Sequence, residues 1–441
     1  MEAKKFISGF SKMSKEEKIQ WISDFYNKDG KLDLKMFEAF WQKDESLQKV
    51  LENFSENTIS NFPMPFGIAP NFHINDKVYA VPMVIEESSV VAAASSAAKF
   101  WMDKGGFKCE VLGTVKIGQL HFKFSGGVDA LKEHFDRIKS TLIESVEAIT
   151  VNMRKRGGGV LDMELVDFSE QEDSYYQLRV SFETCDSMGA NFINSVLEQF
   201  GHELKAYLNN HYKEEQTEIV MAILSNLTPN CIVRASVSCP IDALDTISPA
   251  FSGAEFAERF RMAVRIAEID PYRATTHNKG IYNGVDSVVL ATGNDFRAVE
   301  ACGHAYASKD GSYASLSHCT VEEGIFKFWI DLPIALGTVG GLTKLHPLAN
   351  LALEILGRPS AQELMSIIAA VGLAQNFAAL RSLVTTGIQK GHMKMHLKNI
   401  LTQFNANAAE EQAVTTYFSN KVISHSAVRD YLMDLRTQVE Q

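Results

Sequence analysis

The segment Glu86-Glu87-Ser88-Ser89 is the first of five polar segments whose side chains could carry chemistry. It lies where a predicted strand at 77–84 gives way to a predicted helix at 88–101. Carboxylates are common in the first turn of a helix because they complement the positive end of its dipole. Catalysis would instead require one carboxyl to be desolvated and to keep its proton near neutral pH, so that it could act as an acid. The segment alone leaves capping and acid catalysis open.

Two cations stand six residues apart in the second segment, which runs from Asp270 to Gly280. Arg273 suits a substrate carboxylate because its guanidinium presents a fork of donors, whereas Lys279 offers a compact charge for a developing oxyanion. A solvated loop with surface charges is the alternative interpretation.

The third and fourth segments each place one titratable side chain near glycine. Asp295 follows a predicted strand at 287–290 and a turn at Gly293, where a carboxylate can pair with a buried lysine. A turn or cap role is the alternative.

His392 and His396 have the i, i+4 spacing of a zinc pair, but no Glu lies between them and no third ligand is evident. A single titrating His392 that protonates a leaving group fits the sequence better than metal, with a surface histidine as the remaining alternative.

The fifth segment, from Asp186 to Asn194, predicts a strand that turns into a helix at Gly189. The free amides at such a helix start can bind a pyrophosphate. The fingerprint G-x-G-x-x-G is absent from the whole chain, which disfavours a standard Rossmann dehydrogenase.

The elements that position these segments follow from the hydrophobic pattern. A charged, helix-prone region begins at Ser14, whose spacing to Glu17 has the form of a capping box. Further along, strands are predicted at 109–124, 160–168 and 175–183, and helices at 129–153, 189–211, 376–402 and in the polar tail 405–441. Strand–helix–strand–strand–helix within about 100 residues is the size of a small separate α+β domain.

The composition sets outer bounds on function. The chain has 441 residues, 46% of them hydrophobic, so two or three domains are expected. A net charge of -11 argues against a nucleic-acid binder. The six cysteines are scattered without a C-x-x-C pair, as in a protein of a reducing compartment. No signal peptide and no membrane span is predicted, so we expect a cytoplasmic protein.

Taken together, six motifs closely resemble those of class II (soluble, bacterial-type) 3-hydroxy-3-methylglutaryl-coenzyme A (HMG-CoA) reductases. They lie at 86–95, 186–191, 270–297, 339–348, 371–376 and 391–393, in the order of the family. The resemblance extends from about residue 7 to residue 402. It implies an oxidoreductase of the mevalonate pathway, in which two hydride transfers from NAD(P)H reduce HMG-CoA through mevaldehyde to mevalonate and release CoA.

The resemblance also implies an α+β architecture in three parts. A large mixed helical and sheet domain that binds HMG-CoA would comprise residues 1–111 and 223–385. A small cofactor domain of non-Rossmann type would be inserted at 112–222, and a helical flap would follow at 386–441. The family forms homodimers, some further oligomerised, in which substrate on one subunit meets cofactor on its partner.

Residue roles carry over where the motifs match. Glu87 aligns with the catalytic glutamate, Lys279 with the lysine that stabilises the substrate oxygen, Asp295 with the aspartate that holds both, and His392 with the flap histidine that protonates the CoA thiolate. The residues expected to hold substrate or to orient Lys279 are Ser89, Arg273, Asn283 and Asn226. The residues expected at the cofactor are Asp186, Met188, Gly189, Ala190, Asn191, Asn194, Thr150 and Arg154. No metal is required.

The cofactor preference is predicted from Thr150, which occupies the place of an Asp found in NADH-using members when residues are counted back from Gly157. Thr150 does not repel a 2′-phosphate, and a basic run at 154–156 supplies positive charge, so NADPH is favoured over NADH. Three alternatives remain: the same enzyme run oxidatively in mevalonate breakdown, a silent acyl-CoA-binding relative, and a zinc hydrolase that uses His392.

Overall fold

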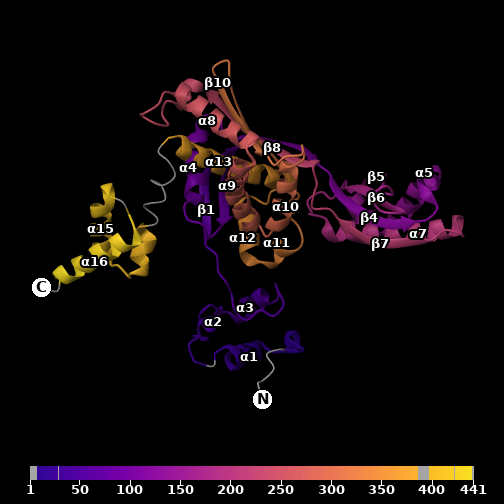
Figure 1. Cartoon of the computed structure of the whole chain (residues 1–441), viewed down its shortest axis with the longest axis horizontal. Coiled ribbons are helices and arrows are strands. Elements are labelled where there is room, and N and C mark those ends of the chain that lie inside the picture. The colour runs from indigo at the N-terminus through magenta and orange to yellow at the C-terminus, as the bar shows by residue number, and fades with distance from the viewer. Residues whose placement is uncertain (1–6, 28, 386–396, 422, 440–441) are drawn as a thin grey trace.

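The computed structural model describes residues 7–27, 29–385, 397–421 and 423–439 (Figure 1). Its first part is a set of short helices that lies apart from the main body in Figure 1. These are η1 (Phe10–Lys12), α1 (Lys15–Tyr26), α2 (Met36–Ala39) and α3 (Glu45–Glu52). The capping box at the start of α1 is confirmed, because the Glu17 amide donates to Ser14 Oγ and the Ser14 amide donates to the Glu17 carboxylate.

Two antiparallel sheets form the framework of the main body. The smaller sheet pairs β1 (Phe66–Ile74) with β2 (Lys77–Val84). The larger has the order β3-β8-β10-β9, with bounds Lys108–Thr114, Cys231–Pro240, Ile325–Pro333 and Ser317–Glu322. The helices are α4 (Val90–Met102), η2 (Ile241–Leu244), α8 (Gly253–Ile269), α9 (Pro271–Ala291), α10 (Phe296–Ala307), α11 (Leu342–Leu345), α12 (Pro347–Ile355) and α13 (Ala361–Val384).

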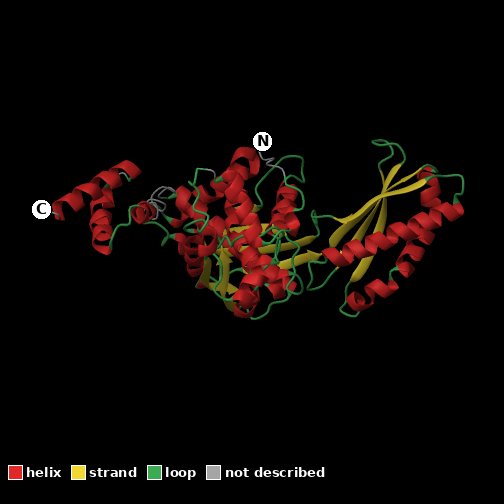
Figure 2. Ribbon diagram, turned by 90° about the horizontal axis from the view of Figure 1, so that it is seen from below, coloured by secondary structure: helices red, strands yellow, loops and turns green. Residues whose placement is uncertain are grey.

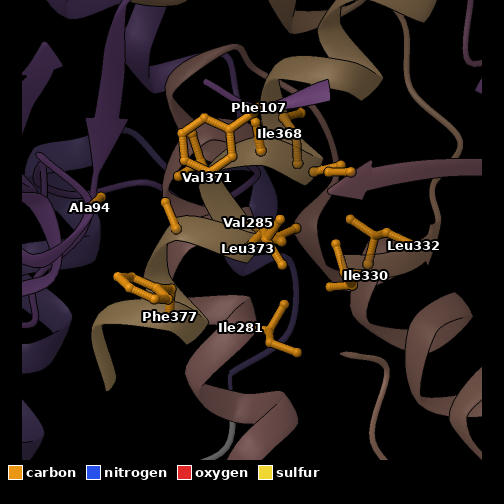
Figure 3. Packing of buried hydrophobic residues seen from close by; sticks show 14 of the residues in the cluster. Ala94, Phe107, Ile281, Val285, Ile330, Leu332, Ile368, Val371, Leu373 and Phe377 are labelled. Carbon is orange, nitrogen blue, oxygen red and sulfur yellow. The ribbon is translucent and has the colours of Figure 1, made fainter. Parts of the chain in front are cut away.

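The core of this body is built around α13, whose side chains meet α9, β10 and α4 (Figure 3). By length and composition α13 could cross a membrane, but 72% of its most apolar window is buried inside the protein, as in a core helix. Two glycines let α9 and α13 approach closely. A Cβ at Gly284 would lie 2.9 Å from the Val371 carbonyl oxygen, and one at Gly372 would lie 2.8 Å from Val285 Cγ2. The close approach at Gly284 holds the first half of α9, which carries Arg273 and Lys279, next to α13.

Two predictions for this body are wrong. Residues 287–290 belong to α9 and not to a strand, and α13 begins at Ala361, well before the predicted start at 376. In both cases burial against neighbouring elements decides the structure of an apolar stretch whose periodicity is ambiguous.

A second unit lies to one side of the main body (Figure 2). Its sheet has the order β5-β6-β4-β7 and is entirely antiparallel, with bounds Gly159–Asp167, Tyr175–Glu183, Lys116–Phe124 and Thr217–Leu224. The helices α5 (Gly127–Ser145), α6 (Glu147–Arg154) and α7 (Ala190–His211) accompany it and share a separate hydrophobic cluster with the sheet. The α+β fold class is therefore confirmed, and this sheet has none of the parallel pairing of a Rossmann domain.

The chain leaves and re-enters the main body through neighbouring strands. Thr114 at the end of β3 pairs with Cys231 at the start of β8, and just beyond this point Gly118 of β4 pairs with Leu224 of β7. The second unit is thus attached through two adjacent chain segments.

The described C-terminal residues form α15 (Ala408–Tyr417), η3 (Phe418–Asn420) and α16 (His425–Val439). They share a small hydrophobic cluster that includes Leu397, Val414 and Leu432. The helical character predicted for the tail is confirmed for these residues.

Candidate active site

A cleft of about 880 Å³ opens between the start of α4, the first half of α9 and the end of α13. It brings together Glu87, Ser89, Arg273, Lys279 and Asn283, five residues that the sequence had placed in two separate segments. Residues nearly 200 positions apart meet here because the Gly284–Gly372 crossing sets α9 beside α13, while α4 packs against the same helix.

The centre of this cleft is an ion pair. Lys279 Nζ donates to Glu87 Oε2 at 2.7 Å, and Asn283 Nδ2 donates to the same oxygen at 3.3 Å. The side chains of Lys279 and Glu87 are 61% and 39% exposed, so the pair adds little to stability. Its position at a cleft wall, with the lysine still open to solvent, leaves the ammonium free to contact a bound ligand.

Ser89 adopts a strained backbone conformation at the edge of the cleft. Its φ of 76° is left-handed, which a serine rarely adopts, and it immediately precedes the first residue of α4. Such strain is found at ligand-binding sites, where surrounding structure maintains it. Ser89 lines the cleft together with Val90 at the start of α4.

Arg273 gives the cleft an uncompensated positive charge. Burial lowers the pKa of its guanidinium, and no described carboxylate pairs with it. A partly buried guanidinium without an anionic partner is unfavourable unless a ligand supplies one. The cleft is therefore suited to a ligand with a carboxylate near Arg273 and a polarised oxygen near Lys279.

A second cleft of about 500 Å³ lies where the second unit meets the main body. Four of the predicted cofactor residues line it, namely Met188, Gly189, Ala190 and Asn191. The sequence reasoning missed its other walls, which include Asn152, Arg156 and the loop 337–343. The basic run that contains Arg156, and the glycine pair at 340–341 in one of the motifs, were the signals that could have identified them.

Asp186 connects the two units beside this cleft. Its Oδ1 accepts from the Ala361 amide at 2.8 Å, and its carbonyl accepts from the Thr338 amide at 2.9 Å. Next to it, Gly189 has a φ of 92°, and a Cβ there would lie 2.5 Å from Thr184 Cγ2. Only glycine fits this turn into α7.

Three other predicted cofactor residues do not line the second cleft. Thr150 is 2% exposed, and its hydroxyl donates to the Val146 carbonyl and accepts from Arg154 Nε. Arg154 lies near Glu147 at 3.7 Å, and Asn194 Oδ1 accepts from the Leu224 amide. Thr150 is therefore buried in α6, and its predicted contact with the cofactor stays a prediction.

Asp295 lies on the second cleft and not on the first. It caps α10 and forms a bidentate ion pair with Arg297, whose hydrogen bonds and charge lower the pKa of the Asp295 carboxyl despite partial burial. Lys279 is twelve positions before Ala291, the last residue of α9, which is about 18 Å along the helix axis, and the Asp295 carboxyl is paired with Arg297 beyond that end of the helix. The expected contact between them is absent within one chain.

The two remaining site residues lie elsewhere. Asn226 lines a small enclosed cavity together with Lys116, Met188 and Cys302, not the first cleft. His392 lies outside the described residues, as does its proposed zinc partner His396. No group of three metal-binding side chains occurs within the described ranges.

Comparison with known proteins matches residues 14–397 to the family model for hydroxymethylglutaryl-coenzyme A reductase. The 3-hydroxy-3-methylglutaryl-coenzyme A reductase of Archaeoglobus fulgidus is 36% identical over 409 residues, which cover 92% of this chain and 89% of the relative. A probable reductase of the same name from Borreliella burgdorferi is 32% identical over 417 residues, covering 92% and 91%. Among solved structures, a class II reductase from Streptococcus pneumoniae bound to NADPH in open conformations superposes with a TM-score of 0.70 at 36% identity, covering 86% of this chain and all of that one.

Proposed function

Since the chain belongs to the hydroxymethylglutaryl-coenzyme A reductase family, as a member of its class II, we propose specific roles for its residues in the reduction of HMG-CoA to mevalonate. The protein is an oxidoreductase that uses a reduced nicotinamide and a CoA thioester. The observation that carries the assignment of roles is the group Glu87, Lys279 and Asn283 in one cleft.

The first cleft would hold the acyl part of the substrate. Arg273 would pair with the free carboxylate of the 3-hydroxy-3-methylglutaryl group, and Ser89 would add a hydrogen bond. Lys279 would then lie at the thioester oxygen and stabilise the negative charge that grows on it as hydride arrives from the nicotinamide. The Glu87 carboxylate accepts from Lys279 and Asn283 in the free protein, so it would first take up a proton from solvent and would then donate that proton to the substrate oxygen.

The departure of CoA needs a separate acid. The thiol of CoA has an ordinary pKa near 8.5, so a thiolate that is not protonated can recombine with mevaldehyde. We assign its protonation to His392. After this step, the second hydride transfer would use Lys279 and Glu87 again on the aldehyde oxygen.

The location of Asp295 supports a homodimer with shared sites. Asp295 shares the second cleft with the residues proposed for the cofactor, whereas Lys279 lines the first cleft. If the second cleft of one protomer faces the first cleft of its partner, Asp295 and the nicotinamide would reach Lys279 together. We propose that arrangement, which completes a site that one chain leaves incomplete.

NADPH is the proposed cofactor. The Streptococcus pneumoniae structure was determined with NADPH, and Arg156 places a guanidinium on the wall of the second cleft of this chain. A 2′-phosphate would accept hydrogen bonds from it. Thr150 would contribute indirectly, by accepting from Arg154 Nε on the same helix.

We further propose that the enzyme is cytoplasmic and works in the biosynthetic direction, with mevalonate oxidation as the alternative. The decisive assay follows nicotinamide absorbance with HMG-CoA and each cofactor in both directions. Oxidation of NADPH with formation of mevalonate and free CoA is expected. A folded protein without turnover would instead favour the silent acyl-CoA-binding relative.

A further inference from the structure

A buried chain of hydrogen bonds runs beneath the first cleft and joins three elements. His277 Nε2 of α9 lies 2.6 Å from Ser317 Oγ of β9, and the Ser317 hydroxyl donates to Asn376 Oδ1 of α13 at 2.8 Å. None of the three side chains is more than 2% exposed. His277 and Asn376 also line the cleft, so the chain links the protein interior to the cleft wall.

The direction of these hydrogen bonds follows from the number of protons. The single hydroxyl proton of Ser317 goes to Asn376, so Ser317 must accept from His277, and the imidazole carries its proton on Nε2. Nδ1 is then a bare acceptor, and it is buried without a hydrogen-bond partner among the described residues. Burial, reinforced by the charge of Arg273, lowers the pKa of His277 to about 3, which keeps the ring neutral.

The hydrogen bonds from His277 through Ser317 to Asn376 determine which end of the Asn376 amide faces the ligand. Because Oδ1 is occupied by Ser317, the group that Asn376 offers to the cleft is its NH2. A flipped amide would make Ser317 donate to His277 Nε2 and move the ring proton to Nδ1, which would then be a buried donor without a hydrogen-bond partner among the described residues. The cleft wall therefore presents a fixed donor, set by two residues behind it.

We propose that His277 and Ser317 are positioning residues that hold the Asn376 NH2 toward the cleft, where it donates to an oxygen of the acyl substrate. The identity of that substrate rests on the proposed function. The unsatisfied Nδ1 supports a positioning role, because a side chain retained only for packing would not leave a buried acceptor unpaired. We call the hydrogen-bonded series His277–Ser317–Asn376 the relay. It requires a neutral imidazole that carries its proton on Nε2.

Variants of Ser317 test the relay against its surroundings. Ser317→Ala should raise the KM for HMG-CoA on the order of tenfold and leave the KM for NADPH unchanged, as expected when one substrate hydrogen bond is lost. Ser315→Ala is the matched control. Ser315 is also buried, and its Oγ contacts Ser317 in three ways: it donates to the Ser317 carbonyl at 2.8 Å, accepts from the Ser317 amide at 3.0 Å and lies 3.4 Å from Ser317 Oγ. Within the described residues it makes no hydrogen bond to His277 or Asn376, so its removal tests whether loss of a neighbouring serine is enough, and it should change neither KM by more than about twofold.

Variants of His277 test whether another side chain that can donate a hydrogen bond to Ser317 preserves the KM for HMG-CoA. The amide of His277→Gln can still donate to Ser317, so this variant should keep a nearly normal KM, whereas His277→Leu should behave like Ser317→Ala. A folded Ser317→Ala protein with an unchanged KM for HMG-CoA, or an equal rise in Ser315→Ala, would overturn the proposal.

A spectroscopic measurement tests the tautomer of His277 independently of any kinetic constant. Nitrogen NMR of the wild-type protein labelled in histidine, with the His277 signals identified by their loss in His277→Gln, should show a neutral ring protonated on Nε2 down to about pH 5. A ring protonated on Nδ1, or a charged ring, contradicts the relay. Wild-type protein that shows the expected tautomer but no HMG-CoA turnover would refute the proposed function and leave the relay in place.

Discussion

At the scale of single residues, the proposed proton donor and the proposed oxyanion partner are in direct contact. Lys279 and Glu87 share a hydrogen bond that is half open to solvent, which gives little stability but places both groups on the wall of one cleft. Lys279 is proposed to act in every reductive step, whereas His392 is proposed to act only when sulfur leaves.

The proposed roles of Lys279 and His392 can be separated by comparing the reduction of HMG-CoA with the reduction of mevaldehyde. Lys279→Ala should lower both HMG-CoA reduction and the reduction of supplied mevaldehyde, by on the order of 10²–10³-fold, as for other oxyanion donors. His392→Gln should lower HMG-CoA reduction while mevaldehyde reduction largely survives, because the aldehyde has no thiolate to protonate. Steady-state rates with each substrate measure this, alongside substrate affinity. Equal losses in both reactions of His392→Gln would contradict a dedicated thiolate acid.

Arg156 offers a second test at this scale, with its neighbour as control. Arg156→Ala should raise the KM for NADPH roughly tenfold and that for NADH little, because only NADPH carries a 2′-phosphate for the guanidinium. Lys155→Ala removes an exposed charge that does not line the second cleft and should change neither value much. Equal effects of the two variants would indicate a general electrostatic field and no specific contact.

The sequence identified the substrate cleft better than the cofactor cleft, for a physical reason. Glu87, Ser89 and Lys279 lie in long motifs that fix each position along the chain. Thr150 was placed by counting residues, which locates a position but does not say which way its side chain points within a helix. Asp295 was placed correctly along the chain, but no pattern in one sequence indicates that it lines a different cleft from Lys279 of the same chain.

At the scale of elements, α9 carries three of the five proposed residues in the first cleft, and its residues 287–290 were predicted as a strand. Residues 287–290 contain a β-branched run, yet they continue the helix because α9 is buried against α10, α12, α13 and β2. Tertiary packing here overrides local propensity. In the second unit, β5, β6 and α7 lie close to their predicted bounds because their alternation and length are unambiguous, whereas β7 was not predicted.

The contact between α9 and α10 predicts a pH dependence of stability. Burial, together with a hydrogen bond and repulsion from Glu300, raises the pKa of Asp286 to about 8, so Asp286 is protonated in the folded protein at neutral pH. The folded state then binds more protons than the unfolded state between about pH 4 and pH 8, and stability falls as pH rises through that window. Asp286→Asn has no proton to lose and should remove this part of the dependence.

Urea unfolding at pH 5 and pH 8, at equal protein concentration, measures the effect. The loss of unfolding free energy between these values should be smaller in Asp286→Asn than in wild type by at least about 1 kcal/mol. Parallel pH profiles for the two proteins would show that Asp286 is ionised in the folded state.

At the scale of the whole molecule, the separation of Lys279 and Asp295 predicts complementation between inactive variants. In a heterodimer of Lys279→Ala and Asp295→Asn chains, one shared site would carry both changes and the other site would carry neither. Mixing the two proteins through a dissociation step should therefore restore about a quarter of wild-type activity, because half of the dimers are mixed and each has one intact site of two.

Mixing either variant with itself is the control and should restore nothing. If the mixed sample also stays inactive while mass measurement shows that mixed dimers have formed, Lys279 and Asp295 do not act in a site shared between chains.

The attachment of the second unit has a consequence for how such a protein can be altered. Its two connecting segments lie side by side, since Thr114 pairs with Cys231 at one end and Gly118 with Leu224 at the other. A piece of chain whose ends are adjacent behaves as a cassette: it can be exchanged as a block while the sheet behind it keeps its register. If the second unit binds the cofactor as proposed, exchange with the corresponding block of a relative should transfer that relative's nucleotide preference and leave the proposed acyl pocket unchanged.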